Sequence, residues 1–86
     1  MQISVFLLLF GALKEGSSIS LQLPENIRVK DLLIELSQRK EIIGDYKIWV
    51  DEFLNVCVIR DGVLLALEDN LNEGDIIRVF PQLHGG

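Results

Sequence analysis

The segment SISLQLP, residues 18–24, continues into ENIRVKDLLIEL, residues 25–36, and the two parts differ in how their apolar residues are spaced. In the first part, apolar residues alternate with serine and glutamine, as in a strand with one buried face: Ile19, Leu21 and Leu23. Pro24 ends this strand, because proline has no N–H to donate to a neighbouring strand. In the second part the spacing is i, i+3, i+4 and i+7, which is one face of a helix: Val29, Leu32, Leu33 and Leu36. The sequence therefore predicts a strand and then a helix over residues 29–40.

More strands are predicted on both sides of this unit. Residues 3–10 are apolar except for Ser4, on both alternating phases towards the end, and they form a hairpin with residues 19–23 through a turn at residues 11–16. Residues 56–60 are rich in β-branched side chains, and Asp61-Gly62 is a strong signal for a two-residue turn into a short return strand at 63–65. A turn at residues 73–75 precedes the last strand, 76–80.

Two parts of this pattern are less regular. Asn26 is a candidate cap for the helix, although no Glu or Gln stands where a capping box needs one. Residues 42–54 have no clean period, so we expect a loop with one short helical or extended piece. One helix after the first hairpin, followed by more strands, predicts an α+β fold in which a mixed sheet carries one main helix on one face.

Composition excludes several classes of protein. The 86 residues are 49% hydrophobic, enough for one domain with a dense core and too much for a disordered chain. One cysteine cannot form a disulfide within the chain, so a cytoplasmic location is expected. The net charge of −5 argues against nucleic-acid binding. The apolar run at residues 3–13 is shorter than the roughly 20 residues of a membrane span, and it lacks the flanks of a signal peptide.

Side chains suited to catalysis are few. His84 stands alone near the end of the sequence, and Cys57 lies between two valines, where a free cysteine usually acts as a small core residue. One cysteine and one distant histidine do not make a metal site, so no metal is expected. The acidic pairs 51–52 and 68–69 have the character of solvated loop charge.

The informative feature is the segment PQLHGG, residues 81–86. Glycine has no side chain, so Gly85 and Gly86 can thread a channel that a Cβ would block. A terminal carboxylate, with a pKa of about 3.5, is ionised at neutral pH and available to attack a phosphoanhydride. Six extended residues reach roughly 20 Å beyond the sheet. We therefore expect a β-rich domain at residues 1–80 and a tail at residues 81–86.

The chain resembles the ubiquitin-like β-grasp sulfur carriers of the MoaD and ThiS type, and most closely the small subunit of molybdopterin synthase. The resemblance rests on LNEGDIIRVFP, residues 71–81, followed by the tail to Gly86, and on the order of the other elements. Gln82 stands where that family has a second proline, which predicts a looser tail, and Arg28 stands where it often has a capping Ser or Thr.

The resemblance implies a protein that serves as a reagent. An adenylating enzyme (MoeB-like) would use ATP and magnesium to activate the carboxylate of Gly86, and sulfur transfer would then give a thiocarboxylate. The tail residues Pro81, Leu83, His84 and Gly85 would thread into the large subunit of molybdopterin synthase (MoaE-like), where sulfur reaches the molybdopterin precursor. This chain would bind no cofactor itself, and it would be a non-catalytic subunit of a sulfurtransferase rather than an enzyme alone.

Strand alternation predicts a partner surface. If the odd-numbered apolar residues 3–9 face the helix, then Phe6, Leu8 and Phe10 face away from it. On the last strand Ile77 and Val79 are predicted inward, which leaves Ile76, Arg78 and Phe80 outward. For residues 56–60 we expect Cys57 and Ile59 inward, with Val56, Val58 and Arg60 outward.

The predicted contact residues are thus Phe6, Leu8, Val58, Arg78 and Phe80. The alternative is that residues 42–54 cover this patch.

Other functions stay open. A carrier for thiazole synthesis, tRNA thiolation or protein conjugation would share the Gly-Gly tail and the fold. A β-grasp interaction module with no carrier role would have the same fold and an incidental Gly-Gly.

Overall fold

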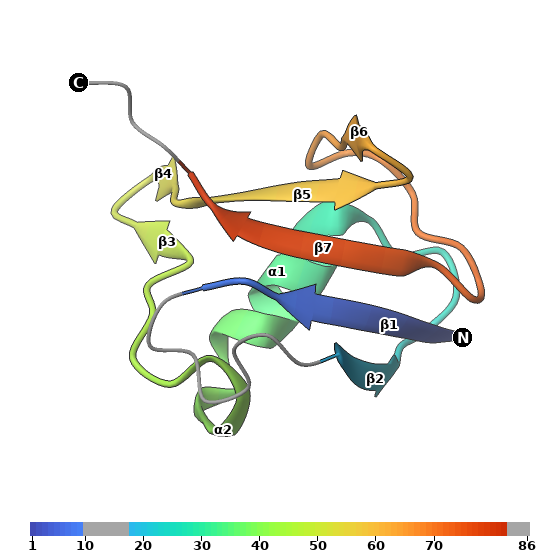
Figure 1. Ribbon diagram of the computed structural model, residues 1–86, viewed down its shortest axis with the longest axis horizontal. Helices are drawn as coiled ribbons and strands as arrows, with labels where there is room; N and C mark the ends of the chain where they lie inside the picture. The colour runs from blue at the N-terminus through green and yellow to red at the C-terminus, as the bar shows by residue number, and fades with distance from the viewer. Residues whose placement is uncertain (10–17, 83–86) are drawn as a thin grey trace.

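Five strands form one mixed sheet in the order β2-β1-β7-β5-β6, and helix α1 lies against one of its faces (Figure 1). The structure, a computed structural model, describes residues 1–9 and 18–82. β1 and β7 are parallel, and the other neighbouring strands are antiparallel. The elements are β1 (Gln2–Leu7), β2 (Ser18–Gln22), α1 (Val29–Ser37), α2 (Lys40–Ile43), β3 (Trp49–Val50), β4 (Phe53–Leu54), β5 (Val56–Arg60), β6 (Val63–Leu64) and β7 (Ile76–Pro81). The predicted α+β architecture is confirmed.

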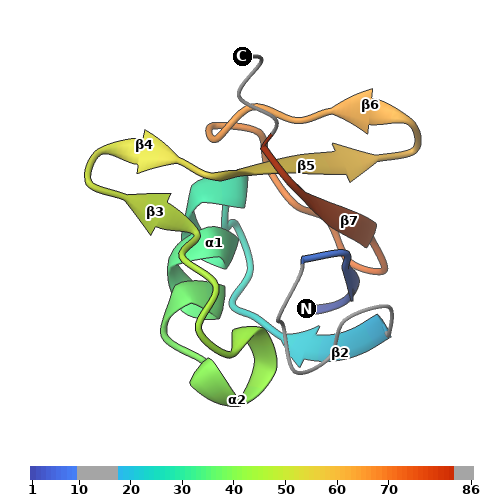
Figure 2. The same cartoon turned by 60° about the vertical axis from the view of Figure 1, so that its left-hand side comes forward.

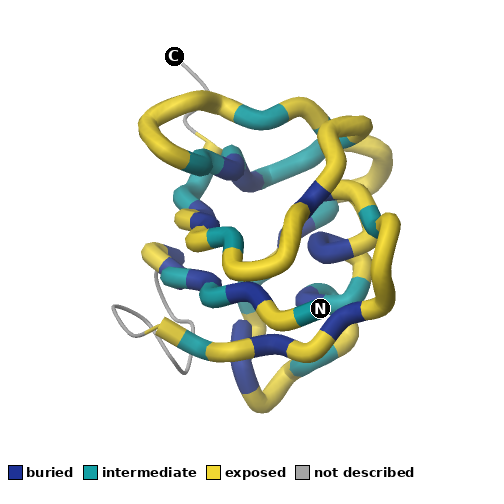
Figure 3. Tube along the Cα trace, turned by 90° about the vertical axis from the view of Figure 1, so that its right-hand side faces the viewer, coloured by how far each residue is buried: buried dark blue, intermediate teal, exposed yellow. Residues whose placement is uncertain are grey.

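The core lies between the sheet and α1. The strand phases predicted for residues 3–9 and for the last strand are confirmed, because these side chains are at most 1% exposed: Ile3, Val5, Leu7, Leu9, Ile77 and Val79. The four apolar helix residues are also buried, and buried positions alternate with exposed ones along the strands (Figure 3). Burial of each Leu, Ile or Val side chain stabilises a fold by about 1.5–3 kcal/mol, so this two-layer core is the main source of stability.

The helix begins at Val29, as predicted, but its cap and its C-terminal end differ from the prediction. Its N-cap is Arg28, whose backbone N–H donates to Asp31 Oδ2 at 2.9 Å. Asn26 is therefore not the cap; it adopts a positive φ of 63° in the preceding turn. The helix ends at Ser37, and the chain then forms the separate four-residue helix α2.

Residues 42–54, predicted as a loop with one short helical or extended piece, hold both kinds of structure: the end of α2 and a small hairpin of β3 and β4. Ile42, Ile43 and Ile48 are buried in the core, which anchors the segment. Figure 2 shows α2 and this hairpin on the side of the sheet that α1 occupies. The segment therefore leaves the opposite face of the sheet uncovered.

The phase predicted for β5 is wrong. Val56 and Val58 are buried, at 0% and 2% exposure, whereas Cys57 and Ile59 are half-buried on the opposite face. Residues that lie opposite each other in adjacent strands share a face of the sheet. Val58 pairs with Val79 and Cys57 pairs with Phe80, so β7 determines which side chains of β5 point inward.

Of the predicted turns, the two that fall within the described residues, at 61–62 and 73–75, are present. Asp61 and Gly62 have φ of 54° and 77°, as a type I′ hairpin turn requires, and Gly74 has φ of 81°. Asp75, the last residue of the second turn, accepts hydrogen bonds from the Asn72 backbone N–H at 2.8 Å and from Arg60 at 2.7 Å. The arginine was predicted to point outward; its side chain is 23% exposed and joins β5 to the start of β7.

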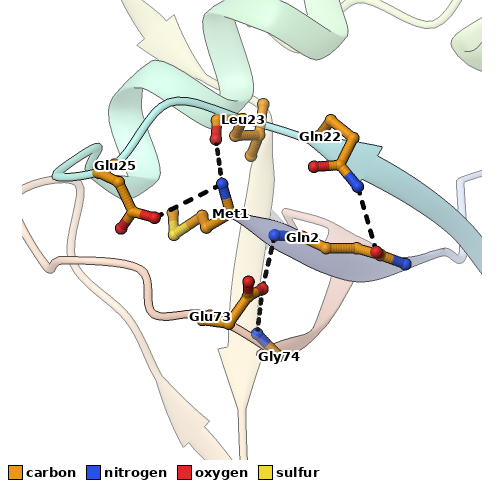
Figure 4. A network of polar contacts seen from close by, with 7 residues as sticks. All are labelled: Met1, Gln2, Gln22, Leu23, Glu25, Glu73 and Gly74. Carbon is orange, nitrogen blue, oxygen red and sulfur yellow. Dashed lines mark hydrogen bonds and ion pairs between the residues drawn. The ribbon is translucent and has the colours of Figure 1, made fainter.

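Hydrogen bonds hold Met1 and Gln2 at one end of the sheet (Figure 4). The Met1 ammonium donates to the Leu23 carbonyl at 2.6 Å, and Glu73 Oε2 accepts from the backbone N–H groups of Gln2 and Gly74. The C-terminal end of β7 lies at the other end of the sheet (Figure 1). The N-terminus is therefore held away from the point where the tail begins.

Candidate functional site

The face of the sheet opposite α1, here called the outer face, carries a row of apolar side chains around one arginine. Ile76 and Leu8 are 49% and 36% exposed, and the other members are half-buried or exposed: Phe6, Cys57, Ile59, Arg78 and Phe80. All but one of the predicted contact residues lie here. Val58 does not, because it is in the core; its neighbours Cys57 and Ile59 take its place.

Arg78 lies at the centre of the outer face. It stands opposite Phe6 on β1 and Ile59 on β5, and its guanidinium carbon is 5.3 Å from the centre of the Phe6 ring. Such a cation–π contact holds the arginine over the apolar row. Arg78 takes part in none of the ion pairs found within residues 1–9 and 18–82. Its charge is therefore presented to solvent or to a partner.

A hollow of about 470 Å³ opens where the outer face meets the end of β7. Its lining is mostly apolar and consists of Cys57, Leu64, Phe80, Pro81 and Gln82. The prediction that Cys57 is a core residue is wrong, because its side chain lines this hollow. The hollow can accept an apolar side chain of a partner beside the point where the tail begins.

The first residues of the tail are held by backbone hydrogen bonds. Pro81 still belongs to β7, opposite Val56, and the Gln82 N–H donates to the Asn55 carbonyl at 3.1 Å. A proline at position 82 could not make this bond. The looser tail predicted from the Pro-to-Gln difference stays a prediction, because residues 83–86 lie outside the described residues.

The Asn55 carbonyl has a second donor, the Tyr46 hydroxyl, at 2.9 Å. The Asn55 side chain in turn donates to the Lys47 carbonyl at 3.1 Å. Burial raises the pKa of Tyr46 above its ordinary value, with a smaller contribution from Cys57. A tyrosine hydroxyl is protonated at neutral pH even without this shift, so it is a donor there. We call Tyr46, Asn55 and Gln82 the clasp, because they join residues 44–55 to the root of the tail.

Sequence patterns did not indicate the clasp. Tyr46 and Asn55 belong to or adjoin a segment without hydrophobic periodicity, and the bond to Gln82 runs between backbone atoms, which any residue except proline at position 82 could form.

The remaining predicted tail residues, Leu83, His84, Gly85 and Gly86, lie outside the described residues, as do Phe10 and the turn at 11–16. Within the described ranges, no group of three or more His, Cys, Asp or Glu side chains could hold a metal ion. None of the helices in that part of the chain has the length and apolar character needed to cross a bilayer.

Comparisons with solved structures agree with this fold. SAMP1 from Haloferax volcanii superposes with a TM-score of 0.74 at 23% identity, and the alignment covers 100% of both chains. A provisionally assigned molybdopterin converting factor, subunit 1, from Pyrococcus furiosus gives 0.71 at 24% identity, covering 96% of this chain and 99% of that one. A ubiquitin-like protein from the archaeon Caldiarchaeum subterraneum gives 0.56 at 17% identity, covering 99% and 100%. A search of curated protein sequences gave no significant match.

The order of the strands and the helix packed on one face of the sheet define a ubiquitin-like β-grasp fold. The sequence profile of the ThiS family matches residues 7–86, and the chain belongs to that family. The match includes the Gly-Gly pair at residues 85–86.

Proposed function

We propose that this chain is the sulfur-carrying small subunit of a molybdopterin synthase, and that it works in the cytoplasm. The observation that carries the proposal is the ThiS family match, which runs from the core of the fold through Gly86. The likeness to the Pyrococcus furiosus protein supports the choice of this pathway among those that use such carriers.

In the proposed reaction, the carboxylate of Gly86 attacks ATP on an adenylating enzyme, which releases pyrophosphate and leaves an acyl-adenylate. A sulfur nucleophile then displaces AMP and gives the thiocarboxylate. ATP and magnesium belong to the adenylating enzyme, so they are co-substrates of the partner rather than groups bound by this chain. The thiocarboxylate donates its sulfur to the molybdopterin precursor in the large subunit, and two carrier molecules supply the two sulfurs of the dithiolene.

The described residues support two steps of this proposal, the docking of the partners and the insertion of the tail. The outer face, with Phe6, Leu8, Arg78 and Phe80, would dock the adenylating enzyme and the large subunit in turn. The hollow beside Phe80 would take an apolar anchor of the partner, since buried apolar anchors dominate the energetics of interfaces. Pro81 and Gln82, held against β5 and the clasp, would set the direction in which Leu83, His84, Gly85 and Gly86 enter the partner.

Intact-mass analysis tests the carrier step. After co-expression with the adenylating enzyme and the sulfur donor of the source organism, the chain should gain the mass difference between sulfur and oxygen. A variant without Gly86 should not gain it and should keep its fold, since the tail lies beyond the core. A chain that keeps its unmodified mass in the presence of active partners would contradict the proposal.

Pathway and carrier role are tested separately. The thiocarboxylate form, mixed with the large subunit and precursor, should yield molybdopterin. A thiocarboxylate that forms but is used only for thiazole or tRNA thiolation would place the chain in a sister pathway. A covalent link between Gly86 and lysine side chains of other proteins would indicate conjugation.

A further inference from the structure

The hairpin of β3 and β4 exposes an apolar pair that the core does not use. Trp49 and Leu54 face each other and pack against the core. Val50 and Phe53 also face each other, at the tip of the hairpin, and are 47% and 71% exposed. No other large apolar side chain in the described residues is exposed as much as Phe53.

The turn between the paired residues is acidic. Asp51 and Glu52 connect the two strands, both are exposed, and neither takes part in an ion pair within residues 1–9 and 18–82. Asp51 adopts a positive φ of 56°, which Asp tolerates better than most residues. The tip therefore presents an apolar contact with two carboxylates beside it.

The clasp holds this tip near the tail. Asn55 directly follows β4, and its carbonyl accepts from both Gln82 and Tyr46. Phe53 precedes Asn55 by two residues, which is roughly 7 Å along an extended chain. Figures 1 and 2 place the hairpin at the same end of the sheet as the end of β7, on the side that α1 occupies. The outer face and the hairpin tip thus lie on different sides of the tail root.

We propose that the tip of the β3–β4 hairpin, residues 50–53, is a second contact for the adenylating enzyme that receives the tail. The partner meets it with an apolar surface bordered by basic residues. This inference rests on the proposed function, because it requires an adenylating partner. An enzyme that joins a carboxylate to ATP must surround the carboxylate and the triphosphate with positive charge. Asp51 and Glu52 complement such a border, and Phe53 supplies the apolar anchor. A partner that holds the tail root from both sides restrains the tail more tightly than contact with the outer face alone.

The test uses the adenylating enzyme of the source organism and ATP–pyrophosphate exchange that depends on the full-length chain. Phe53→Ala should raise the KM for the chain by about five-fold or more with little change in kcat, as expected for the loss of an interface anchor. Val50→Ala should raise it less. The matched control is Val63→Ala, which makes the same change as Val50→Ala at a site with 59% exposure on β6, at the far end of β5 (Figure 1). The control should leave the KM unchanged.

The charged part of the tip is tested by the double variant Asp51→Asn and Glu52→Gln. Asn also tolerates a positive φ, so the turn is kept. The KM should rise about three-fold at low salt, and its dependence on salt should become shallower, because a screened attraction has been removed. Thermal unfolding of each variant checks that the fold is intact.

The outcomes separate the two proposals. If the unaltered chain supports no exchange, the proposed function fails. If it supports exchange while Phe53→Ala leaves the KM unchanged, or if Val63→Ala raises the KM equally, the hairpin is not a partner contact, although the carrier role stands.

Discussion

Two neighbouring residues of β5 test the packing of the sheet, because they lie on opposite faces. Val58 is 2% exposed and pairs with Val79 in the core, whereas Cys57 lines the hollow on the outer face. Val58→Ala removes two buried methyl groups, worth about 1.6 kcal/mol of transfer free energy, and leaves a cavity. We therefore expect a loss of about 2–3 kcal/mol in the free energy of unfolding. Cys57→Ala removes a half-buried thiol and should cost less than about 1 kcal/mol.

Urea unfolding followed by the fluorescence of Trp49, the single tryptophan, measures both changes. A domain of this length has about 4–13 kcal/mol of stability, so both variants should remain folded in buffer. Their effects on partner binding should be reversed: replacing Cys57 alters the docking face, and replacing Val58 does not. If Cys57→Ala destabilises the chain as much as Val58→Ala does, the assignment of faces on β5 is wrong.

Three further predictions follow from the contacts described above. Asp75→Ala should cost about 2–3 kcal/mol in urea unfolding, because it breaks a mostly buried ion pair and a turn hydrogen bond, while Glu68→Ala, which breaks an exposed ion pair with similar geometry, should cost less than about 1 kcal/mol. Equal losses would show that burial does not strengthen the Asp75 contact. The raised pKa of Tyr46 means that the unfolded chain ionises first, so stability should fall as pH rises above about 10, toward the folded-state pKa. Ultraviolet titration of this single tyrosine, with unfolding measured in parallel, checks the sign; Tyr46→Phe should lack this part of the pH dependence. Leu8→Asp should leave the fold intact and weaken partner capture, whereas Leu7→Asp should unfold the chain, because Leu7 is fully buried; the reverse result would mean that β1 is shifted by one residue.

Local patterns were sufficient wherever one face of an element is polar or a turn needs a special backbone. The helix face from Val29 to Leu36, the alternation of Leu21 and Leu23 with polar residues, and the Asp61-Gly62 turn were all predicted from sequence and are present. In each case the residue type itself indicates which side faces solvent or which backbone conformation is allowed. A polar residue marks the solvent side, and glycine at position 62 permits the positive φ.

The candidate site was predictable only in part, for the same reason. Arg78 marks the outward side of β7, so its apolar neighbours Ile76 and Phe80 were assigned correctly. The first four residues of β5, VCVI, have no polar member to mark a side, and a shift of one residue exchanges the two faces.

The sequence by itself therefore determined the main helix, the five strands of the main sheet in chain order, the fold class and the family. Only the tertiary structure decided which side of β5 faces inward, because that depends on the register of β5 with β7. It also decided the contacts of the clasp, in which the Asn55 carbonyl accepts from Gln82 and Tyr46. Both depend on contacts between residues that are distant in the chain. Strand pairing and backbone hydrogen bonds form with almost any side chain, so such contacts leave little trace in the amino-acid sequence.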